Sequence, residues 1–191
     1  MEIRDLGLEG VKEIIPARFR DARGYFTESY NRARFIEAGI DLDWMQDNLS
    51  FSADQYVLRG LHFQKPPFAQ DKLVRVITGA VFDVAVDIRE GSPTYGKWTS
   101  VTLSAEKGNQ ILVPKGFAHG FLTLTPDVHV AYKVTAPYAP DQDRSVRYDD
   151  PAIGVDWPLN GAEPKLSAKD AAAKRISETP TGFVYGGELA E

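Results

Sequence analysis

One short segment of the chain brings together residues that could do acid–base chemistry: Val57-Leu58-Arg59-Gly60-Leu61-His62-Phe63-Gln64. Its β-branched and aromatic content is typical of a strand. Alternation along a strand predicts that four side chains share one face: Leu58, Gly60, His62 and Gln64. Arg59 is expected on the opposite face. Gly60 leaves room there for a ligand or for another backbone to come close, although a lone histidine is more often a core residue bonded to the backbone.

Other expected strands carry further candidates at inward-facing positions. Lys72 and Tyr132 each alternate with valines, and His119 alternates with phenylalanines. A histidine is the natural base at neutral pH. A lysine ammonium stabilises an enolate oxygen, and a tyrosine returns a proton from the other side. Each residue alone has an ordinary structural explanation, but together with His62 they indicate proton abstraction beside a ketone.

The pattern around His62 argues against a metal site. Barrels that bind metal this way usually place a second histidine two positions on, with an acid soon after, and here Gln64 occupies that position. No glutamate follows in the next dozen residues. His62 and His119 alone supply too few donors for a stable site. We therefore expect a metal-free site.

Composition sets the wider limits. The chain has 191 residues, a net charge of -5 and no cysteine, so disulfides and thiolate metal sites are excluded. We expect one domain over residues 1–191. No apolar run is long enough for a membrane span, and no signal-peptide pattern is present, so we expect a cytoplasmic protein. The mild negative charge gives no general attraction to nucleic acid.

Short strand-like stretches recur about every ten residues, with turn residues between them. We expect a strand-forming arm at 1–18, a turn leading into a strand at 19–26, and strands at 46–52, 57–64, 72–77, 81–89, 98–103, 108–113, 117–124 and 128–135. Helices are expected only at 31–38 and 167–175, the second beginning at the N-cap Ser167. The pattern predicts an all-β sandwich or jelly-roll barrel with a few short helices, one near the C-terminus. Asp170 would then be half of a capping box.

Several motifs stand at matching spacings: Gln46-Asp47-Asn48, Arg59-Gly60-Leu61-His62-Phe63-Gln64, Gln70-Asp71-Lys72-Leu73-Val74, Asp83-Val84-Ala85-Val86-Asp87-Ile88-Arg89, Ser92-Pro93-Thr94-Tyr95-Gly96, Pro114-Lys115-Gly116-Phe117-Ala118-His119-Gly120-Phe121 and Leu166-Ser167-Ala168-Lys169-Asp170. In this set the chain resembles the dTDP-4-dehydrorhamnose 3,5-epimerase family, from about Phe19 to Asp170. The tail after Ser177 has no counterpart in that pattern, and we expect it to be mobile.

The resemblance implies a cupin jelly roll, a homodimer, and no metal or organic cofactor. It implies conversion of dTDP-4-dehydro-6-deoxy-D-glucose to dTDP-4-dehydro-L-rhamnose, on the route to dTDP-L-rhamnose. His62 would remove the C3 and C5 protons, and Asp170 would be its dyad partner. Lys72 would stabilise the enolate at O4, and Tyr132 would reprotonate the other face.

The resemblance also implies a set of nucleotide contacts: Arg23, Glu28, Gln46, Asn48, Arg59, His119, Tyr138 and Lys169. Arg59 and Lys169 suit the diphosphate, and Tyr138 suits packing on the sugar or base. Because alternation puts Arg59 opposite His62, it would have to reach the ligand from a neighbouring strand or across a dimer interface.

Four alternatives remain open from the sequence. The chain could invert C3 only, act as a sugar ketoisomerase, bind a nucleotide sugar without turnover, or be a metal-dependent cupin enzyme. The position of Asp170 discriminates the enzyme from the binding protein, and elemental analysis would settle the metal alternative. If Asp170 lies far from His62, the helix-cap interpretation holds and a binding protein is favoured.

Overall fold

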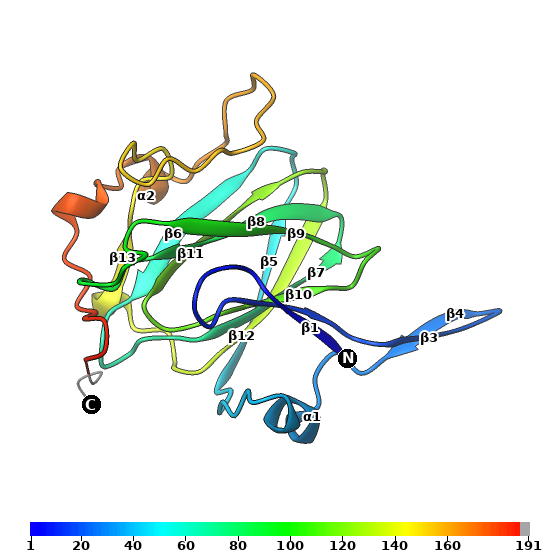
Figure 1. The fold of residues 1–191 in the computed structure, drawn as a ribbon. Helices are drawn as coiled ribbons and strands as arrows, with labels where there is room; N and C mark the ends of the chain where they lie inside the picture. Colours follow the sequence, from blue (N-terminus) through cyan, green and yellow to red (C-terminus); the bar gives the residue numbers. More distant parts are fainter. Residues whose placement is uncertain (188–191) are drawn as a thin grey trace.

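Two antiparallel sheets face each other as a jelly-roll barrel in the computed structural model, which describes residues 1–187 (Figure 1). The six-stranded sheet has the order β1 (Glu2–Asp5), β2 (Lys12–Ile15), β10 (Gln110–Val113), β7 (Lys72–Thr78), β12 (Val128–Val134) and β5 (Gln46–Ser52). The five-stranded sheet has the order β13 (Asp143–Ser145), β6 (Leu58–Gln64), β11 (Phe117–Thr123), β8 (Ala80–Asp87) and β9 (Trp98–Ser104). The all-β jelly-roll prediction is confirmed.

The barrel interior is packed with the apolar residues of both sheets. Val74, Val76 and Val130 come from the six-stranded sheet, and they meet Ala85 and Phe117 of the five-stranded sheet. These are the same strand faces that carry Lys72, Tyr132 and His119. By strand alternation these three polar residues therefore face the barrel interior, as the sequence predicted.

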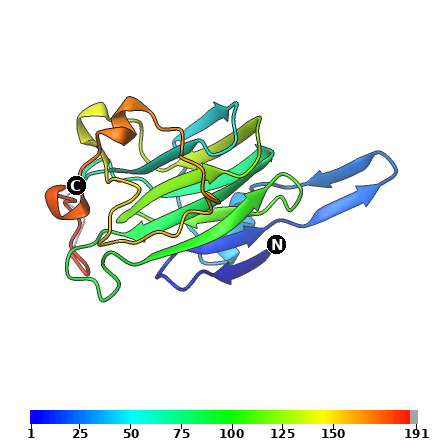
Figure 2. The same ribbon diagram turned by 90° about the horizontal axis from the view of Figure 1, so that it is seen from above.

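A two-stranded hairpin, β3 (Arg18–Asp21) and β4 (Gly24–Thr27), extends away from the barrel (Figure 2). Three of its aromatic side chains are exposed: Phe19, Tyr25 and Phe26. An exposed apolar group of this kind is typical of a surface that meets another protein. Within residues 1–187, no helix is long and apolar enough to cross a membrane.

The helices are short and lie where the sequence predicted them. Asn31 caps α1 (Arg32–Glu37) by accepting the N–H of Arg34, and Gly39 follows it with φ +78°. The second helix, α2 (Ala168–Ala171), begins after Ser167 as expected but is shorter than 167–175. It ends early because Lys174 pairs with Val146 in an isolated bridge. Two 3-10 turns complete the set, η1 (Pro140–Gln142) and η2 (Ile176–Glu178).

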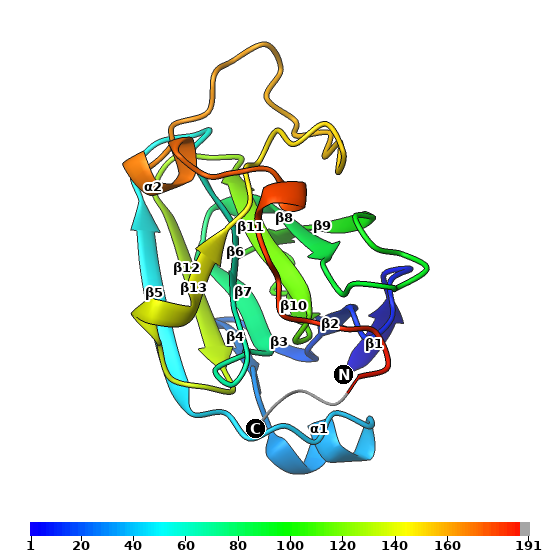
Figure 3. The ribbon, with the colours of Figure 1, turned by 90° about the vertical axis from the view of Figure 1, so that its left-hand side faces the viewer.

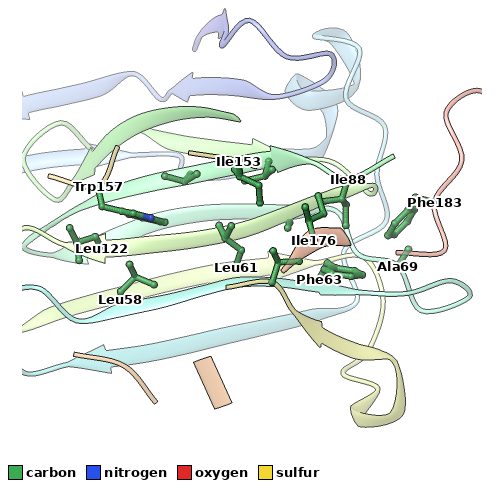
Figure 4. Close-up of a cluster of buried hydrophobic side chains, with 14 residues drawn as sticks. Leu58, Leu61, Phe63, Ala69, Ile88, Leu122, Ile153, Trp157, Ile176 and Phe183 are labelled. Carbon is green, nitrogen blue, oxygen red and sulfur yellow. The ribbon is translucent and has the colours of Figure 1, made fainter. Parts of the chain in front are cut away.

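The C-terminal segment, orange to red in Figure 3, covers the outer face of the five-stranded sheet. Trp157, Ile176 and Phe183 join an outer cluster of buried apolar side chains there, which also holds Leu61 and Leu122. Trp157 lies near Leu122 at one end of this outer cluster, and the ring of Phe183 lies 6.3 Å from that of Phe63 at the other (Figure 4). Burying a large apolar side chain stabilises a fold by about 1.5–3 kcal/mol, so this cluster holds α2 in place.

The expectation of a mobile tail after Ser177 is wrong for most of its length. Phe183 is only 2% exposed, and Val184 forms a bridge with Glu90. Phe183 of this tail packs in the outer cluster. The lack of a family counterpart for the tail gave no information about this packing. The last four residues of the tail, 188–191, lie outside the described part of the chain.

Candidate active site

The centre of the site is a contact between His62 on β6 and Asp170 on α2. Nε2 of His62 lies 2.5 Å from Oδ1 of Asp170, whose side chain is 3% exposed. Burial raises the pKa of Asp170, but the hydrogen bond and charge of His62 outweigh it and leave the pKa lowered. We therefore assign Asp170 as a carboxylate that accepts Nε2–H, which leaves the lone pair of the neutral ring on Nδ1.

Both interpretations of Asp170 hold in part. Its backbone N–H donates to Oγ of Ser167 at 3.1 Å, which is the N-cap contact expected from the sequence. Its carboxylate, however, binds the histidine. The helix cap thus fixes the backbone position from which Asp170 reaches His62, and the condition that favoured a binding protein is not met.

Lys72 begins β7 and lies beside His62, with Nζ 3.4 Å from the His62 carbonyl oxygen. Burial lowers the pKa of Lys72 to about 8, and the nearby carboxylates of Asp143 and Asp83 oppose that shift. An ammonium group that is poorly solvated at neutral pH interacts strongly with a developing oxyanion. Lys72 can therefore stabilise negative charge on a bound substrate.

Tyr132 reaches the same space from β12, where it pairs with Val74 and Asn48. Burial raises the pKa of Tyr132, although the charge of Arg59 acts in the opposite direction. The phenol is accordingly protonated at neutral pH. It is placed to donate a proton, as a general acid must.

Arg59 shares the cavity face with His62, so the expectation from strict alternation is wrong. On β11, His119 and Phe121 are two positions apart, yet they pair with His62 and Arg59, which are three apart. The extra residue on β6 is a β-bulge, which reverses the alternation along the strand. Leu58 consequently joins the outer cluster, whereas the shared inner face of His62 and Gln64 is as predicted.

Gly60 makes the bulge possible. Its φ is +129°, and a Cβ at this position would lie 2.5 Å from Cα of Gly120 on the neighbouring strand. Only glycine combines that backbone conformation with so close an approach of two strands. Of the two expectations for the space at Gly60, a ligand or another backbone, the second is confirmed, because the Gly120 backbone fills it. The bulge turns Arg59 inward.

Two cavities meet at His62, Lys72 and Tyr132. The larger, about 550 Å³, is lined by Arg59, His119 and Asp170 among others, and the smaller, about 280 Å³, by Gln46, Asn48, Tyr138, Asp143 and Lys169. Together they have the size and polar lining of a small-molecule site. Gln46 and Asn48, on the polar face of β5, line the smaller cavity.

Hydrogen bonds fix the side chains around these cavities. Arg59 donates through Nη2 to the Phe51 carbonyl oxygen at 2.8 Å and through Nε to Oγ of Ser52 at 3.2 Å. In the smaller cavity, Lys169 forms an ion pair with Asp143, which also accepts from the Tyr138 hydroxyl. The two bonds of Arg59 thus hold its guanidinium between β6 and β5, at the edge of the larger cavity.

Arg23 and Glu28 lie outside both cavities, so within one chain they are not site residues. Arg23 is at the tip of the β3–β4 hairpin, where its side chain is 90% exposed and pairs with Asp21. Glu28 pairs with Arg34 of α1 at 2.8 Å. The hairpin that carries Arg23 extends away from the barrel (Figure 2), and neither side chain lines the two cavities of its own chain.

Sequence reasoning missed two carboxylates. Asp143 reaches the smaller cavity because the three-residue strand β13 pairs with β6, a pairing that no local pattern indicates. Asp83 lies on β8 in the barrel wall, where it contacts His119. Its position in the alternation of residues 81–89, on an apolar face, was a usable signal for a buried charge.

No cluster of three or more His, Cys, Asp or Glu side chains that could hold a metal ion occurs within residues 1–187. The histidine contacts in the site are His62 with Asp170 and His119 with Asp83, each a pair of one imidazole and one carboxylate. Such pairs fix a ring tautomer.

We expect kcat/KM for an enolate-forming reaction at this site to fall as pH rises through about 8, because Lys72 then loses its proton. The ratio kcat/KM reports groups of the free enzyme. The same shift affects stability: the folded protein gives up this proton at about 8 and the unfolded chain near 10.5, so Lys72 makes the free energy of unfolding increase with pH between those values. Rate and denaturant titrations across this range measure both effects.

Lys72→Met should abolish this fall of kcat/KM with rising pH, which is the alkaline limb of the pH profile. Lys133→Met is the matched control, because Lys133 pairs with Asp47 outside the two cavities and should leave the limb in place. A limb that persists in Lys72→Met would assign it to another group.

Comparison with known proteins adds to this geometry. A sequence model described as dTDP-4-dehydrorhamnose 3,5-epimerase matches residues 5–178. A protein of that name from Sinorhizobium fredii is 51% identical over 185 residues, which cover 97% of this chain and 94% of the relative. Both matches extend over nearly the whole chain.

Solved structures agree in fold. The dTDP-6-deoxy-D-glucose-3,5-epimerase of Legionella pneumophila, in complex with dTDP-4-keto-L-rhamnose, has a TM-score of 0.88 at 47% identity, covering 92% of this chain and 93% of that one. A 3'-monoepimerase from Streptomyces bikiniensis, in complex with dTDP-quinovose, has a TM-score of 0.84 at 35% identity, covering 90% and 86%. The shared fold therefore extends over about nine tenths of this chain.

Proposed function

Because the chain belongs to the dTDP-4-dehydrorhamnose 3,5-epimerase family, we propose that it is an isomerase that inverts C3 and C5 of dTDP-4-dehydro-6-deoxy-D-glucose to give dTDP-4-dehydro-L-rhamnose. The family membership predicted from the motifs is confirmed. The observation that carries the proposal is the His62–Asp170 contact, with Lys72 and Tyr132 lining the same cavity. A protein that only binds a nucleotide sugar has no need of that arrangement.

Each inversion is a proton removed and a proton returned. Nδ1 of His62 takes the C3 proton, and the electrons of the C–H bond form a C3–C4 double bond with negative charge on O4. The Lys72 ammonium stabilises that charge. Tyr132 then gives its proton to the opposite face of C3 and the ketone re-forms, after which solvent restores both groups and the same steps invert C5.

The remaining residues supply binding. We propose Arg59 and Lys169 as contacts of the diphosphate, with stronger geometric support for Arg59 because Lys169 is already paired with Asp143. Gln46, Asn48, His119 and Tyr138 line the two cavities and are proposed to contact the sugar and nucleoside. The proposed proton transfers use only His62, Lys72 and Tyr132. Elemental analysis of the active protein tests whether any metal is needed.

We propose that the protein is a homodimer in which the hairpin of one copy reaches the site of the other. The exposed aromatic residues of β3 and β4 supply an apolar contact surface. An open groove of about 440 Å³ lies on the outer face of the six-stranded sheet, lined by Leu49, Ile77 and Ala131 among others. Such a dimer would bring Arg23 and Glu28 to the partner's nucleotide.

Complementation tests the dimer. An Arg23→Ala chain keeps its own His62, and a His62→Ala chain keeps its own Arg23, so a mixed dimer contains one complete site. Random pairing of co-expressed chains should then restore about a quarter of the sites. Light scattering measures the oligomeric state, and a monomer, or no recovery in the mixed sample, would contradict the proposal.

The reaction is tested by incubating the protein with dTDP-4-dehydro-6-deoxy-D-glucose in heavy water and following C3 and C5 by proton NMR. Exchange with inversion at both carbons is the expected result. Inversion at C3 alone would make the protein a 3-epimerase, and migration of the ketone would make it a ketoisomerase. Binding without exchange would leave a nucleotide-sugar-binding protein.

Two broader expectations stay predictions. We propose that residues 1–191 form one epimerase domain, which limited proteolysis can test. We also propose a cytoplasmic location, which cell fractionation can test.

A further inference from the structure

A carboxylate is built into the wall of the barrel beside the proposed site. Asp83 is 0% exposed and alternates on β8 with Val81 and Ala85, which belong to the apolar interior. Across the sheet it pairs with Phe121 of β11. A buried carboxylate is costly unless it is hydrogen-bonded and faces a positive charge, so its partners indicate what it does.

The first partner is His119. Nε2 of His119 lies 2.9 Å and 3.0 Å from the two carboxylate oxygens of Asp83. A carboxylate can only accept hydrogen bonds, so this contact places the ring proton on Nε2. Because His119 also lines the larger cavity, Asp83 sets the orientation in which the ring meets a ligand.

The second partner is Lys72. Two carboxylates, Asp143 on β13 and Asp83 on β8, favour its ammonium form, and Lys169 of α2 opposes it. Asp143 is already neutralised by its ion pair with Lys169. The other ionisable groups that line the two cavities are Asp54, Arg59, His62, His119, Tyr132, Tyr138, Lys165 and Asp170. Asp170 is engaged by His62, and Asp54 by Lys165. Of the two carboxylates that favour the Lys72 ammonium, Asp143 has the larger effect and Asp83 the smaller, but Asp83 is paired with a histidine and Asp143 with a second lysine.

We propose that Asp83 is a positioning residue of the reaction: its carboxylate, held against His119 in the barrel wall, orients that ring and adds buried negative charge beside the cavity that Lys72 lines. That charge, with the charge of Asp143, favours the ammonium form of Lys72 when O4 becomes an enolate. The inference rests on the proposed function, because only an enolate-forming reaction needs a protonated Lys72. Asp83 itself does not touch the substrate. Burial raises the pKa of Asp83, and His119 and Lys72 counteract this, so the three groups depend on one another.

Asp83→Asn tests the charge while keeping the shape. We expect the alkaline limb of kcat/KM to move down by about one pH unit, since an opposite charge close to an ionisable group shifts its pKa by about 1–3 units. At pH 8 the rate should fall about fivefold, and at lower pH it should recover. Affinity for dTDP, which lacks the sugar, should be unchanged.

Asp87→Asn is the matched control. Asp87 is equally buried on the same strand, but it is held by Arg89, Ser92 and Thr94. Losing its charge should lower the melting temperature and leave the alkaline limb in place. If Asp83→Asn loses stability without moving the limb, Asp83 is only structural and the inference is overturned.

A second measurement does not depend on activity or on an Asp83 variant. Nitrogen-15 NMR of the wild-type protein, with the His119 signals assigned through His119→Gln, should show Nε2 protonated and Nδ1 unprotonated when the ring is neutral. The opposite tautomer would overturn the inference. A wild-type protein that shows the expected tautomer but exchanges neither C3 nor C5 would instead contradict the proposed function.

Discussion

Replacing His62 by alanine is expected to lower deuterium exchange and inversion at both C3 and C5 by about 10³-fold or more, within the range that general acid–base catalysis supplies. No other group replaces the base, because Asp170 is 3% exposed and faces the position of the lost ring. Water in the vacated space is a much weaker base than imidazole. The loss should affect kcat more than KM, since His62 acts on the reacting carbons. Proton NMR in heavy water measures both carbons in one experiment.

His129→Ala is the control for removing a histidine from the sheet. The His129 ring stacks on Phe51 at 4.7 Å and lies outside the two cavities, so its loss should leave the rate unchanged. Binding of dTDP to His62→Ala shows that the site is still formed. A variant that binds dTDP and still exchanges C3 at the wild-type rate would place the base elsewhere.

Much of the site could be predicted from strand periodicity alone. Lys72, His119 and Tyr132 were assigned to the lumen because each alternates with apolar residues, and period-2 alternation continues along regular strands. Their structural neighbours are those apolar residues. Reasoning of this kind succeeds because burial of one strand face imposes its pattern on the sequence.

The parts that failed depend on features without a local signature. A single extra residue at Gly60 reverses the alternation, so Arg59 was placed on the wrong face. The cap pattern that identified the start of α2 gave no information about the Asp170 carboxylate, because its partner His62 is distant in the chain. Arg23 and Glu28 illustrate another limit: their proposed contact with the site of a second copy cannot be located in one chain.

Tyr132→Phe should separate proton removal from inversion. The base and the ammonium group remain, so the C3 proton is still taken to give the enolate. Without a phenol on the opposite face, His62 exchanges its proton with solvent and returns a deuteron to the face from which the proton came. We expect inversion to fall by about 10²-fold or more, while deuterium still enters C3 with its configuration retained. Proton NMR distinguishes the two outcomes, because retained and inverted sugars have different ring couplings.

Tyr148→Phe provides the comparison, since Tyr148 packs against the outer cluster and not in the site. Its exchange and inversion should match those of the wild-type protein. If Tyr132→Phe loses exchange together with inversion, the phenol is needed for proton removal, and the assignment of His62 as sole base fails. If it inverts at the wild-type rate, water or another side chain delivers the proton. Exchange with retention is the result that only a base and an acid on opposite faces can explain, because the acid is then missing while the base continues to work.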